Sequence, residues 1–477
     1  MSSGIDCLTN VDTSLTSYFK PFAVKMEQER LPSIVINLFK CYFSQLLFGS
    51  QGKLTKKEIL PIQPDELQDL ASLQKYAPLG EKALKQLVIF KLNGGLGTTM
   101  GLKIPKSLIP VKQGKSFLDL SLEQIEFLRN KFKIEIPLIF MNSFYTHEKT
   151  MEVLPASLNN RDIPASFVQH KFPRILQKDL TPATWPEDPN LEWNPPGHGD
   201  FYTALLTSKL LDKLLDQGIR YAFISNVDNL GATLDLGVLG YMIREELNFI
   251  MEVTPRTPLD KKGGHLCRLL KNFRLALREV AQCPHNELQE FQDTKLYAFF
   301  NTNSLWIDLL QVKKIFLHHK LMPLDLIINE KNIVASNPDS PKVYQLETAI
   351  GSAISAFDFA DAINVPRTRF SPVKTTADLL LVRSNCYNLD EGKNIVLNPN
   401  QTLPQISLDP KFYKNFHEFE KRFPHPVKFE HCSQLEVKGD IIFGENITFK
   451  NKVTVINNSD QQITLKNKTL EGEVIFN

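Results

Sequence analysis

Several short apolar runs in this chain end abruptly in polar, turn-forming residues, and this pattern constrains the fold most. Leu87–Lys91 (LVIFK) stops at Asn-Gly-Gly, and Tyr221–Ser225 (YAFIS) stops at Asn-Val-Asp-Asn. Runs of this length that are rich in aliphatic and aromatic residues predict strands buried on both faces. We predict such strands at Leu87–Lys91, Ile136–Met141, Tyr221–Ser225 and Phe249–Thr254.

Helical patterns lie between the predicted strands. Phe117–Phe132 has apolar residues at helical spacing, and residues 201–218 carry a leucine stripe that stops at Gly218, a common helix terminator. Alternating strands and helices predict an α/β domain with a mainly parallel central sheet. In such sheets ligands bind beyond the carboxyl ends of the strands, so we expect the functional motifs at strand ends or in loops.

The remaining segments flank this domain. Residues 1–75 have helical patterning without a recognisable site, which predicts a helical N-terminal segment. Residues 386–477 contain short β-rich segments separated by Gly and Asn at near-regular intervals, which is typical of a small β-domain built from β-helix coils. We therefore expect a central α/β domain over residues 76–385, between a helical segment and a β-domain.

Charge and composition exclude several classes of protein. The 477 residues contain 55 Lys and Arg against 53 Asp and Glu, so the net charge is +2 and no broad basic surface favours nucleic acid or a membrane. The start, MSSGIDCLTN, lacks the regions of a signal peptide, and no apolar stretch is long enough to cross a bilayer. None of the cysteines forms a CxxC pair, which favours reduced thiols. We expect a cytoplasmic protein that binds neither nucleic acid nor membrane.

A glycine-rich segment, Leu92–Leu108 (LNGGLGTTMGLKIPKSL), follows the first predicted strand. Its glycines let backbone N–H groups approach phosphates closely, and Lys106 can neutralise those phosphates. The nearby Gly114-Lys115-Ser116 is not part of a P-loop, because Ile109 stands where the first glycine is required. The glycine spacing also differs by one residue from that of a dinucleotide-binding fingerprint.

Two further motifs carry ionisable side chains. Trp193–Asp200 (WNPPGHGD) opens the predicted helix 201–218 and sets His198 between two glycines. Because a helix N-terminus favours an anion, we expect His198 to face a ligand. Asp228 follows the strand that ends at Ser225, where a carboxylate can hold Mg²⁺ together with substrate phosphates. The alternative for Asp228 is an ordinary turn-forming residue.

Other polar windows suit sugars and phosphates. Groups apt for sugar hydroxyls occur in Lys262–Gly264, Phe300–Trp306 and Gln345–Ala349. A proline-stiffened stretch, Asn364–Asp378, gathers Arg367, Arg369 and Lys374. We interpret these three cations as a pyrophosphate clamp, and the alternative is a solvated basic loop.

Taken in order, these motifs resemble those of the eukaryotic UDP-glucose pyrophosphorylase family. The similarity extends from about Leu87 to Ser384 and rests on the collinear strings KLNGGLGTTMG, PPGHGDFY, SNVDNLGAT, FNTNSLW, QLETAIGSAI and NVPRTRF. The resemblance implies the reaction UTP + glucose 1-phosphate ⇌ UDP-glucose + pyrophosphate, with Mg²⁺ as cofactor. It also implies a Rossmann-like nucleotidyltransferase domain and a C-terminal left-handed β-helix.

The resemblance assigns roles to the residues at matching positions. Lys106 and Lys374 would be catalytic, Asp228 would hold Mg²⁺, and Gln169 would recognise the uracil. The nucleotide would be bound by Leu92, Asn93, Gly94, Gly95, Lys106, Gln169, Gly197, Asn226, Val227, Asp228 and Lys374. The sugar phosphate would be bound by Gly94, Gly95, His198, Asn226, Asn303 and Glu347. The absence of GxSxG and HExxH motifs agrees with a transfer that depends on positioning and charge neutralisation.

The sequence departs from the family pattern in two places. The family usually has Cys-Lys-Gly-Pro-Lys where this chain has Leu102–Lys106, so Ile104 replaces a small residue. The tail lacks a stretch between Leu465 and Glu471 that longer members have. Fungal and animal members build high oligomers through this C-terminal domain. Because the shortened tail should change the surface through which they assemble, we expect this chain to be a monomer or a small oligomer.

Two alternative functions stay open. One is a pyrophosphorylase for another sugar, such as N-acetylglucosamine 1-phosphate. That related family typically has Gly-Asn-Gly-Gly where this chain has Gly197–Asp200, which disfavours it. The other is a catalytically weak paralogue with a binding or regulatory role.

Overall fold

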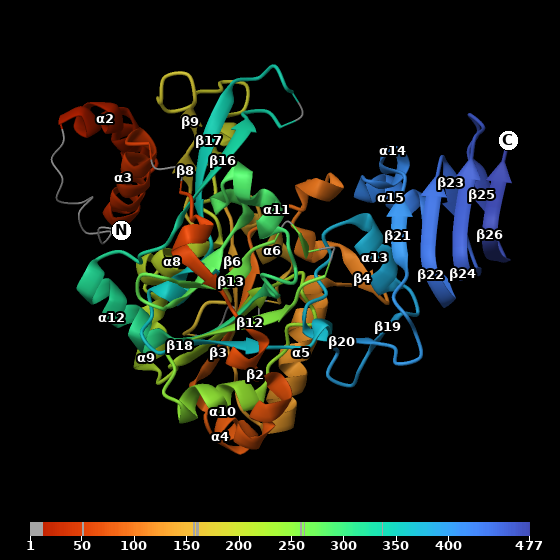
Figure 1. Ribbon diagram of the computed structural model, residues 1–477, viewed down its shortest axis with the longest axis horizontal. Helices are drawn as coiled ribbons and strands as arrows, with labels where there is room; N and C mark the ends of the chain where they lie inside the picture. Colours follow the sequence, from red (N-terminus) through yellow and green to blue (C-terminus); the bar gives the residue numbers. More distant parts are fainter. Residues whose placement is uncertain are drawn as a thin grey trace.

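The structure is a computed structural model, and it describes residues 13–49, 52–155, 158, 162–257, 260–261, 263–335 and 337–477. A central α/β body carries two N-terminal helices on one side and a stack of C-terminal strands at the opposite end (Figure 1). The α/β class expected from the alternating pattern is therefore confirmed.

The central sheet follows the order β2-β18-β12-β15-β11-β3-β6-β7. Its strands are β2 (Gln68–Asp69), β18 (Ala360–Asn364), β12 (Phe249–Pro255), β15 (Phe299–Asp308), β11 (Tyr221–Asn226), β3 (Leu87–Asn93), β6 (Leu138–Asn142) and β7 (Ser166–Val168). Neighbouring strands on this path pair in parallel, except that β15 pairs antiparallel with β11 and β12. The predicted mainly parallel sheet is confirmed, and each of the predicted strands forms.

Both faces of the sheet are buried, as continuous apolar strands require. In β3, Ile89 faces one hydrophobic cluster together with Phe223 of β11. The intervening Phe90 faces the second cluster together with Ile224. The strands β1 (Ile59–Pro61), β13 (His265–Leu269) and β14 (Leu275–Arg278) extend the sheet beside β15.

Helices cover this sheet (Figure 1). Helix α5 (Phe117–Phe132) has the predicted bounds, and the Ser116 side chain caps its N-terminus by accepting from the Asp119 N–H. The predicted helix 201–218 is wrong as a single element, because it forms α8 (Phe201–Thr207) and α9 (Leu210–Asp216). Lys209 between them has a left-handed backbone with φ 61°, which interrupts the helical hydrogen bonds.

The other helices of the described α/β body are short or of moderate length. They are α4 (Ala77–Lys82), α6 (His147–Val153), α10 (Leu236–Arg244), α11 (Leu288–Phe291), α12 (Leu309–His319) and α13 (Thr376–Arg383). Smaller sheets are formed by β4 (Pro110–Lys112) with β5 (Lys115–Ser116), β8 (Phe172–Pro173) with β10 (Trp193–Asn194), β19 (Tyr387–Leu389) with β20 (Ile395–Leu397), and β9 (Ile175–Leu176) with β17 (Lys342–Thr348) and β16 (Leu326–Asn332).

The N-terminal helices α2 (Thr13–Gln28) and α3 (Ser33–Leu47) confirm the helical patterning of this region. Their aromatic side chains pack together, and Phe39 of α3 meets Phe172 of β8 edge-on with 5.2 Å between ring centroids. The helical expectation does not hold for the whole of residues 1–75, because β1 and β2 lie within it and join the sheet. None of the described helices is both long and apolar enough to span a membrane.

The C-terminal strands pair in parallel without intervening long helices. They are β21 (Gln405–Leu408), β22 (Lys428–Lys438), β23 (Ile441–Phe443), β24 (Ile447–Asn457), β25 (Ile463–Leu465) and β26 (Lys468–Phe476), beside helices α14 (Pro410–Tyr413) and α15 (Phe416–Arg422). One sheet has the order β21-β22-β24-β26, and β23 pairs with β25 in a second sheet. The chain thus alternates between two sheets of parallel strands.

The cysteines differ from the expectation in one respect. Cys267, Cys283, Cys386 and Cys432 are free and buried. Cys41 of α3 is disulfide-bonded, so the prediction that the cysteines are reduced thiols is wrong for this residue.

Candidate active site

The carboxyl ends of β3 and β11 bring together the glycine-rich segment and the Asn-Val-Asp-Asn motif. The two strands are parallel neighbours, with Asn226 opposite Leu92. The Val227 N–H donates to the Leu92 carbonyl at 3.1 Å, which ties the starts of the two loops together. The side chains of Leu92 and Val227 are buried and apolar, so their backbones supply the polar groups that these residues can offer a ligand.

The first residues of the glycine-rich segment are fixed by hydrogen bonds with residues at the end of β6 and after it. Asn93 is 1% exposed, and its side-chain amide donates to Asn142 Oδ1 at 2.8 Å and to Thr150 Oγ1 at 3.0 Å. The hydroxyls of Thr146 and Ser143 donate to the carbonyls of Asn93 and Gly94. Asn93 is therefore a support beneath the loop, and its side chain does not face the solvent.

Gln169, just after β7, lies against the glycine-rich segment. A Cβ on Gly94 would lie 2.3 Å from Gln169 Nε2, so this position tolerates only glycine while the amide stays in place. Gln169 is 6% exposed, and its Oε1 has no hydrogen-bond partner among the described residues. A buried amide oxygen without a partner is costly, which makes it a candidate acceptor for a ligand N–H.

Lys106 and Asp228 form the electrostatic centre of the site. Lys106 Nζ donates to Asp228 Oδ2 at 2.6 Å, and the two side chains are 12% and 19% exposed. The Lys106 N–H also donates to the Gly95 carbonyl at 3.3 Å, which folds the glycine-rich segment back over the strand end. A cation and a carboxylate thus stand together at the edge of the sheet.

Ile104, where the sequence departs from the family pattern, contacts the hydrophobic core. Ile104 is partly buried and packs with Leu102 against the large hydrophobic cluster. The larger side chain therefore adds to the core beneath the loop.

Asn303 reaches the site from within a strand. Its Nδ2 donates to Asn226 Oδ1 at 2.9 Å, and its own Oδ1 has no partner among the described residues. Asn303 has a left-handed backbone with φ 60°, where the register between β12 and β15 shifts. The expectation that every motif follows a strand or lies in a loop is wrong here, because a bulge inside β15 presents the side chain.

Glu347 also belongs to a strand, β17, so it departs from the same expectation. It pairs with Ile327 of β16. Burial raises the pKa of the Glu347 carboxyl, and a hydrogen bond with Asn329 opposes this rise. Glu347 lies beside Gly197, since a Cβ on Gly197 would come within 3.3 Å of Glu347 Cβ and 2.4 Å of the Thr348 carbonyl.

His198 is held by the segment after β17. The Ile350 N–H donates to His198 Nδ1 at 2.9 Å, so Nδ1 must be an acceptor and the proton of the neutral ring must lie on Nε2. Burial lowers the pKa of His198 to about 4, which keeps the ring neutral near pH 7. The helix after His198 is α8, which has seven residues and is shorter than the predicted helix 201–218.

Lys374 lies on the segment between β18 and α13. Its side chain is exposed, and Nζ lies 6.0 Å from the ring centroids of Phe300 and Phe370. The Val373 N–H donates to the Asp228 carbonyl at 3.4 Å, so the backbone at Lys374 is next to the end of β11. Lys374 Nζ has no salt bridge to Asp228 or any other carboxylate of the described residues. The structure brings it to the edge of the site without joining it to the pair of Lys106 and Asp228.

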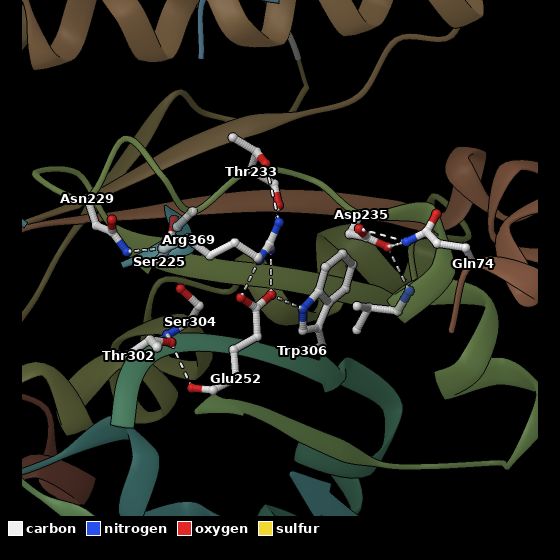
Figure 2. Close-up of polar contacts among 12 residues, drawn as sticks. Gln74, Ser225, Asn229, Thr233, Asp235, Glu252, Thr302, Ser304, Trp306 and Arg369 are labelled. Carbon is white, nitrogen blue, oxygen red and sulfur yellow. Dashed lines mark hydrogen bonds and ion pairs between the residues drawn. The ribbon is translucent and has the colours of Figure 1, made fainter. Parts of the chain in front are cut away.

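The proposed clamp of three cations is wrong for Arg369. Arg369 is 8% exposed, and its guanidinium pairs with the buried Glu252 (Figure 2). Arg367 pairs with Asp260 at 2.7 Å. Both guanidiniums are paired with carboxylates, whereas Lys374 has no carboxylate partner among the described residues.

In the Lys262–Gly264 window, Gly263 and Gly264 pack against Phe300 and Glu279. Lys262 lies outside the described residues. A Cβ on Gly263 would collide with the Phe300 ring at 1.8 Å, and one on Gly264 would lie 2.7 Å from the Glu279 carboxylate. Burial raises the pKa of Glu279, and the charge of Lys374 opposes the rise. Glu279 is therefore a residue near Lys374 that the sequence motifs did not indicate.

No preformed metal cluster is present in the described part of the chain, in the sense of three or more His, Cys, Asp or Glu side chains that converge. Asp228 is the carboxylate at the edge of the sheet, beside the amide of Asn226. This donor set lacks the oxygen ligands for a fully protein-bound ion.

Comparisons with known proteins agree with this arrangement. A sequence model of the UTP–glucose-1-phosphate uridylyltransferase family (UDPGP) matches residues 36–450. A probable UTP–glucose-1-phosphate uridylyltransferase of Schizosaccharomyces pombe is 37% identical over 460 residues, which cover 95% of this chain and 89% of the relative. The UTP–glucose-1-phosphate uridylyltransferase of Solanum tuberosum is 41% identical over 413 residues, 84% of each chain.

Solved structures show the same fold. A mutant UDP-glucose pyrophosphorylase from Leishmania major in complex with UDP-glucose superposes with a TM-score of 0.88 at 39% identity, covering 96% of this chain and 99% of that one. UDP-glucose phosphorylase from Trypanosoma brucei has a TM-score of 0.88 at 37% identity, covering 97% and 100%. This chain belongs to the UTP–glucose-1-phosphate uridylyltransferase family.

Proposed function

We propose that this protein transfers the uridylyl group of UTP to glucose 1-phosphate and releases pyrophosphate. The observation that carries the proposal is the pairing of Lys106 with Asp228 at the carboxyl ends of two parallel strands, beneath a glycine-rich segment. A phosphate oxygen of glucose 1-phosphate attacks Pα of UTP, and the bond from Pα to the bridging oxygen of pyrophosphate breaks. The reaction needs alignment and charge stabilisation, and no protein nucleophile is required.

The nucleotide would lie over the start of the glycine-rich segment. The free Oε1 of Gln169 can accept the N–H of a uracil ring, and cytosine has no N–H at the corresponding ring position. Gly94 and Gly95 leave the backbone open for the base and the phosphates, and no atom lies within 4 Å of a Cβ built on Gly95. Leu92, Asn93, Gly197, Asn226 and Val227 would complete the nucleotide site as backbone or supporting contacts.

The sugar phosphate would bind on the side of β15 and β17. The neutral His198 presents an Nε2–H, which can donate to a phosphate oxygen of glucose 1-phosphate. The free Oδ1 of Asn303 and the carboxyl of Glu347 are acceptors for sugar hydroxyls. His198 would thus hold the phosphate as a neutral donor, and Asn303 and Glu347 would hold the sugar.

The charges of the transition state would be met by Lys106 and Lys374. Lys106 lies within the pair with Asp228, and Lys374 approaches from the exposed rim, where it can follow the departing pyrophosphate. The single carboxylate fits Mg²⁺, which takes few protein ligands and completes its shell with waters and substrate phosphates. When bound, Mg²⁺ would neutralise phosphate charge, with Asp228 as its protein ligand.

We predict Mg²⁺- and UTP-dependent formation of UDP-glucose from glucose 1-phosphate. Lys374→Ala and Lys106→Ala should each lower kcat by roughly 10²–10³, the usual effect of removing one transition-state donor. A coupled pyrophosphate assay with a panel of sugar 1-phosphates measures both the rate and the sugar preference. Lys313→Ala, which removes a surface pair with Asp212, is the matched control and should leave kcat unchanged.

The assay also separates the alternatives. Product from N-acetylglucosamine 1-phosphate in place of glucose 1-phosphate would select the pyrophosphorylase for another sugar. No product above the Lys374→Ala background with any sugar would select the paralogue with a binding or regulatory role.

Asp228→Asn should raise the Mg²⁺ concentration for half-maximal activity, because an amide oxygen is a weaker ligand than a carboxylate. A Mg²⁺ titration at saturating substrates measures this shift. Asp212→Asn, which breaks a surface ion pair of similar length, provides the control. A titration curve that coincides with wild type would leave Asp228 as a turn-forming residue.

The His198 ring should titrate near pH 4, well below its ordinary pKa of 6.5. The unfolded chain takes up this proton at about pH 6.5 and the folded chain only near pH 4, so the unfolding free energy falls as the pH drops below 6.5. NMR of the imidazole resonances gives the midpoint, and His198→Gln assigns the signal. A midpoint at or above 6.5 would show a ring that is solvated and free to charge.

We also propose a monomer or small oligomer in the cytoplasm, with a left-handed β-helix as the C-terminal domain. The last strand, β26, pairs along β24 from Lys468 to Phe476. Its exposed edge carries Lys468, Glu471 and Glu473, and charges on an edge strand oppose further pairing. Light scattering over a concentration series should give a mass that stays small, and a stable high oligomer at micromolar protein would refute the proposal.

A further inference from the structure

The segment from Pro366 to Lys374 is fixed to the sheet by side chains that the reaction does not use. Arg369 in the middle of this segment is 8% exposed, so its guanidinium is buried, whereas Lys374 is exposed to solvent. The partner of Arg369 is Glu252 of β12, which is fully buried. This inward anchor lies five residues before the lysine, counted along the sequence.

The anchor is a two-point contact. Arg369 Nε donates to Glu252 Oε2 at 2.9 Å and Nη2 donates to Oε1 at 2.7 Å, as Figure 2 shows. Trp306 Nε1 donates to the same Oε1 at 3.0 Å, which fixes the carboxylate in turn. Arg369 Nη2 also donates to the Thr233 carbonyl at 2.8 Å. A planar guanidinium in such a fork fixes orientation as well as distance.

Asn229 links the same segment to the end of β11. Its Nδ2 donates to the Arg369 carbonyl at 3.1 Å, and its Oδ1 accepts from the Ser371 N–H at 3.1 Å. Asn229 directly follows Asp228, whose carbonyl accepts from the Val373 N–H. The backbone that carries Lys374 is therefore tied to the residue next to the carboxylate of the site.

A purely stabilising role is a poor explanation for this arrangement. Burying an arginine and a glutamate together costs desolvation that their attraction only just offsets, and apolar residues of similar size often stabilise a core as well. A two-point contact of this kind holds a loop in one orientation, which is needed where a charged side chain on that loop must keep its position. Lys374 carries that charge at the end of the anchored segment.

We propose that Arg369 is a positioning residue for Lys374, acting through Glu252 and Asn229. This proposal rests on the proposed function, in which Lys374 meets the phosphates. Arg369 and Asn229 set the distance between Lys374 and Asp228. Lys374 and Asp228 can then act on the same phosphates at once. Loss of the fork lets Lys374 sample other positions, which lowers kcat while the substrates still bind.

The first test measures the anchoring and needs no activity. Arg369→Lys keeps the positive charge and loses the fork, so backbone amides of residues 366–375 should exchange hydrogen at least about tenfold faster, as expected for a segment that opens locally. Asn229→Ser is a second variant that cannot bridge Arg369 and Ser371. Arg422→Lys is the matched control, because Arg422 is 6% exposed and pairs with Asp440 and Glu418 in the C-terminal region.

The second test is a double-mutant cycle. Arg369→Lys should lower kcat by about 10–100-fold with KM values for UTP and glucose 1-phosphate within about twofold of wild type. In a Lys374→Ala background the same change should cost less than about threefold, because the lysine to be positioned is gone. Arg422→Lys should leave kcat unchanged in both backgrounds.

Two results would overturn the proposal: unchanged exchange over residues 366–375 in Arg369→Lys, or equal losses of kcat with and without Lys374. Failure of the proposed function has a different signature. The wild type would then form no UDP-glucose, while the exchange measurement would still show whether Arg369 holds the segment.

Discussion

Strands β3 and β11 run side by side in parallel, and the rest of the site depends on this pairing. Because parallel neighbours end at the same edge of a sheet, the glycine-rich segment after β3 and Asp228 after β11 emerge together. The contact of 2.6 Å between Lys106 and Asp228 is the direct result. The antiparallel strand β15 pairs Leu305 with Ile224, so its bulge at Asn303 passes the same edge from the other direction.

The positively charged side chains near the site fall into two groups: lysines that we propose to contact ligand, and arginines that are paired with carboxylates of the protein. A net charge of +2 on 477 residues creates no general attraction for anions, so the affinity for phosphates must come from placed groups. We propose Lys106 and Lys374 as these groups, whereas the guanidiniums of Arg367 and Arg369 are paired with Asp260 and Glu252. His198 remains neutral and can contact an anion as a donor without adding charge.

The sequence predicted the strands and most strand-end motifs because long apolar runs and glycine clusters are local signals. Helix 117–132 has its predicted bounds for the same reason. The break at Lys209 carries no such signal, since lysine seldom adopts a left-handed backbone. The placement of Asn303 inside β15 depends on pairing with β12, and the pairing of Arg369 with Glu252 joins residues 117 positions apart. Contacts of that range require the folded chain.

The reverse reaction, followed by ³¹P NMR, tests the central claim that this strand-edge site exchanges a uridylyl group between two phosphates. The purified protein is mixed with UDP-glucose, pyrophosphate and Mg²⁺, and every phosphorus species is observed at once. The account predicts that UTP and glucose 1-phosphate appear in equal amounts, and that both signals grow roughly 10²–10³-fold more slowly in Lys374→Ala. Release of UMP would contradict it. A spectrum that stays unchanged even at a higher concentration of the wild-type protein would also contradict it.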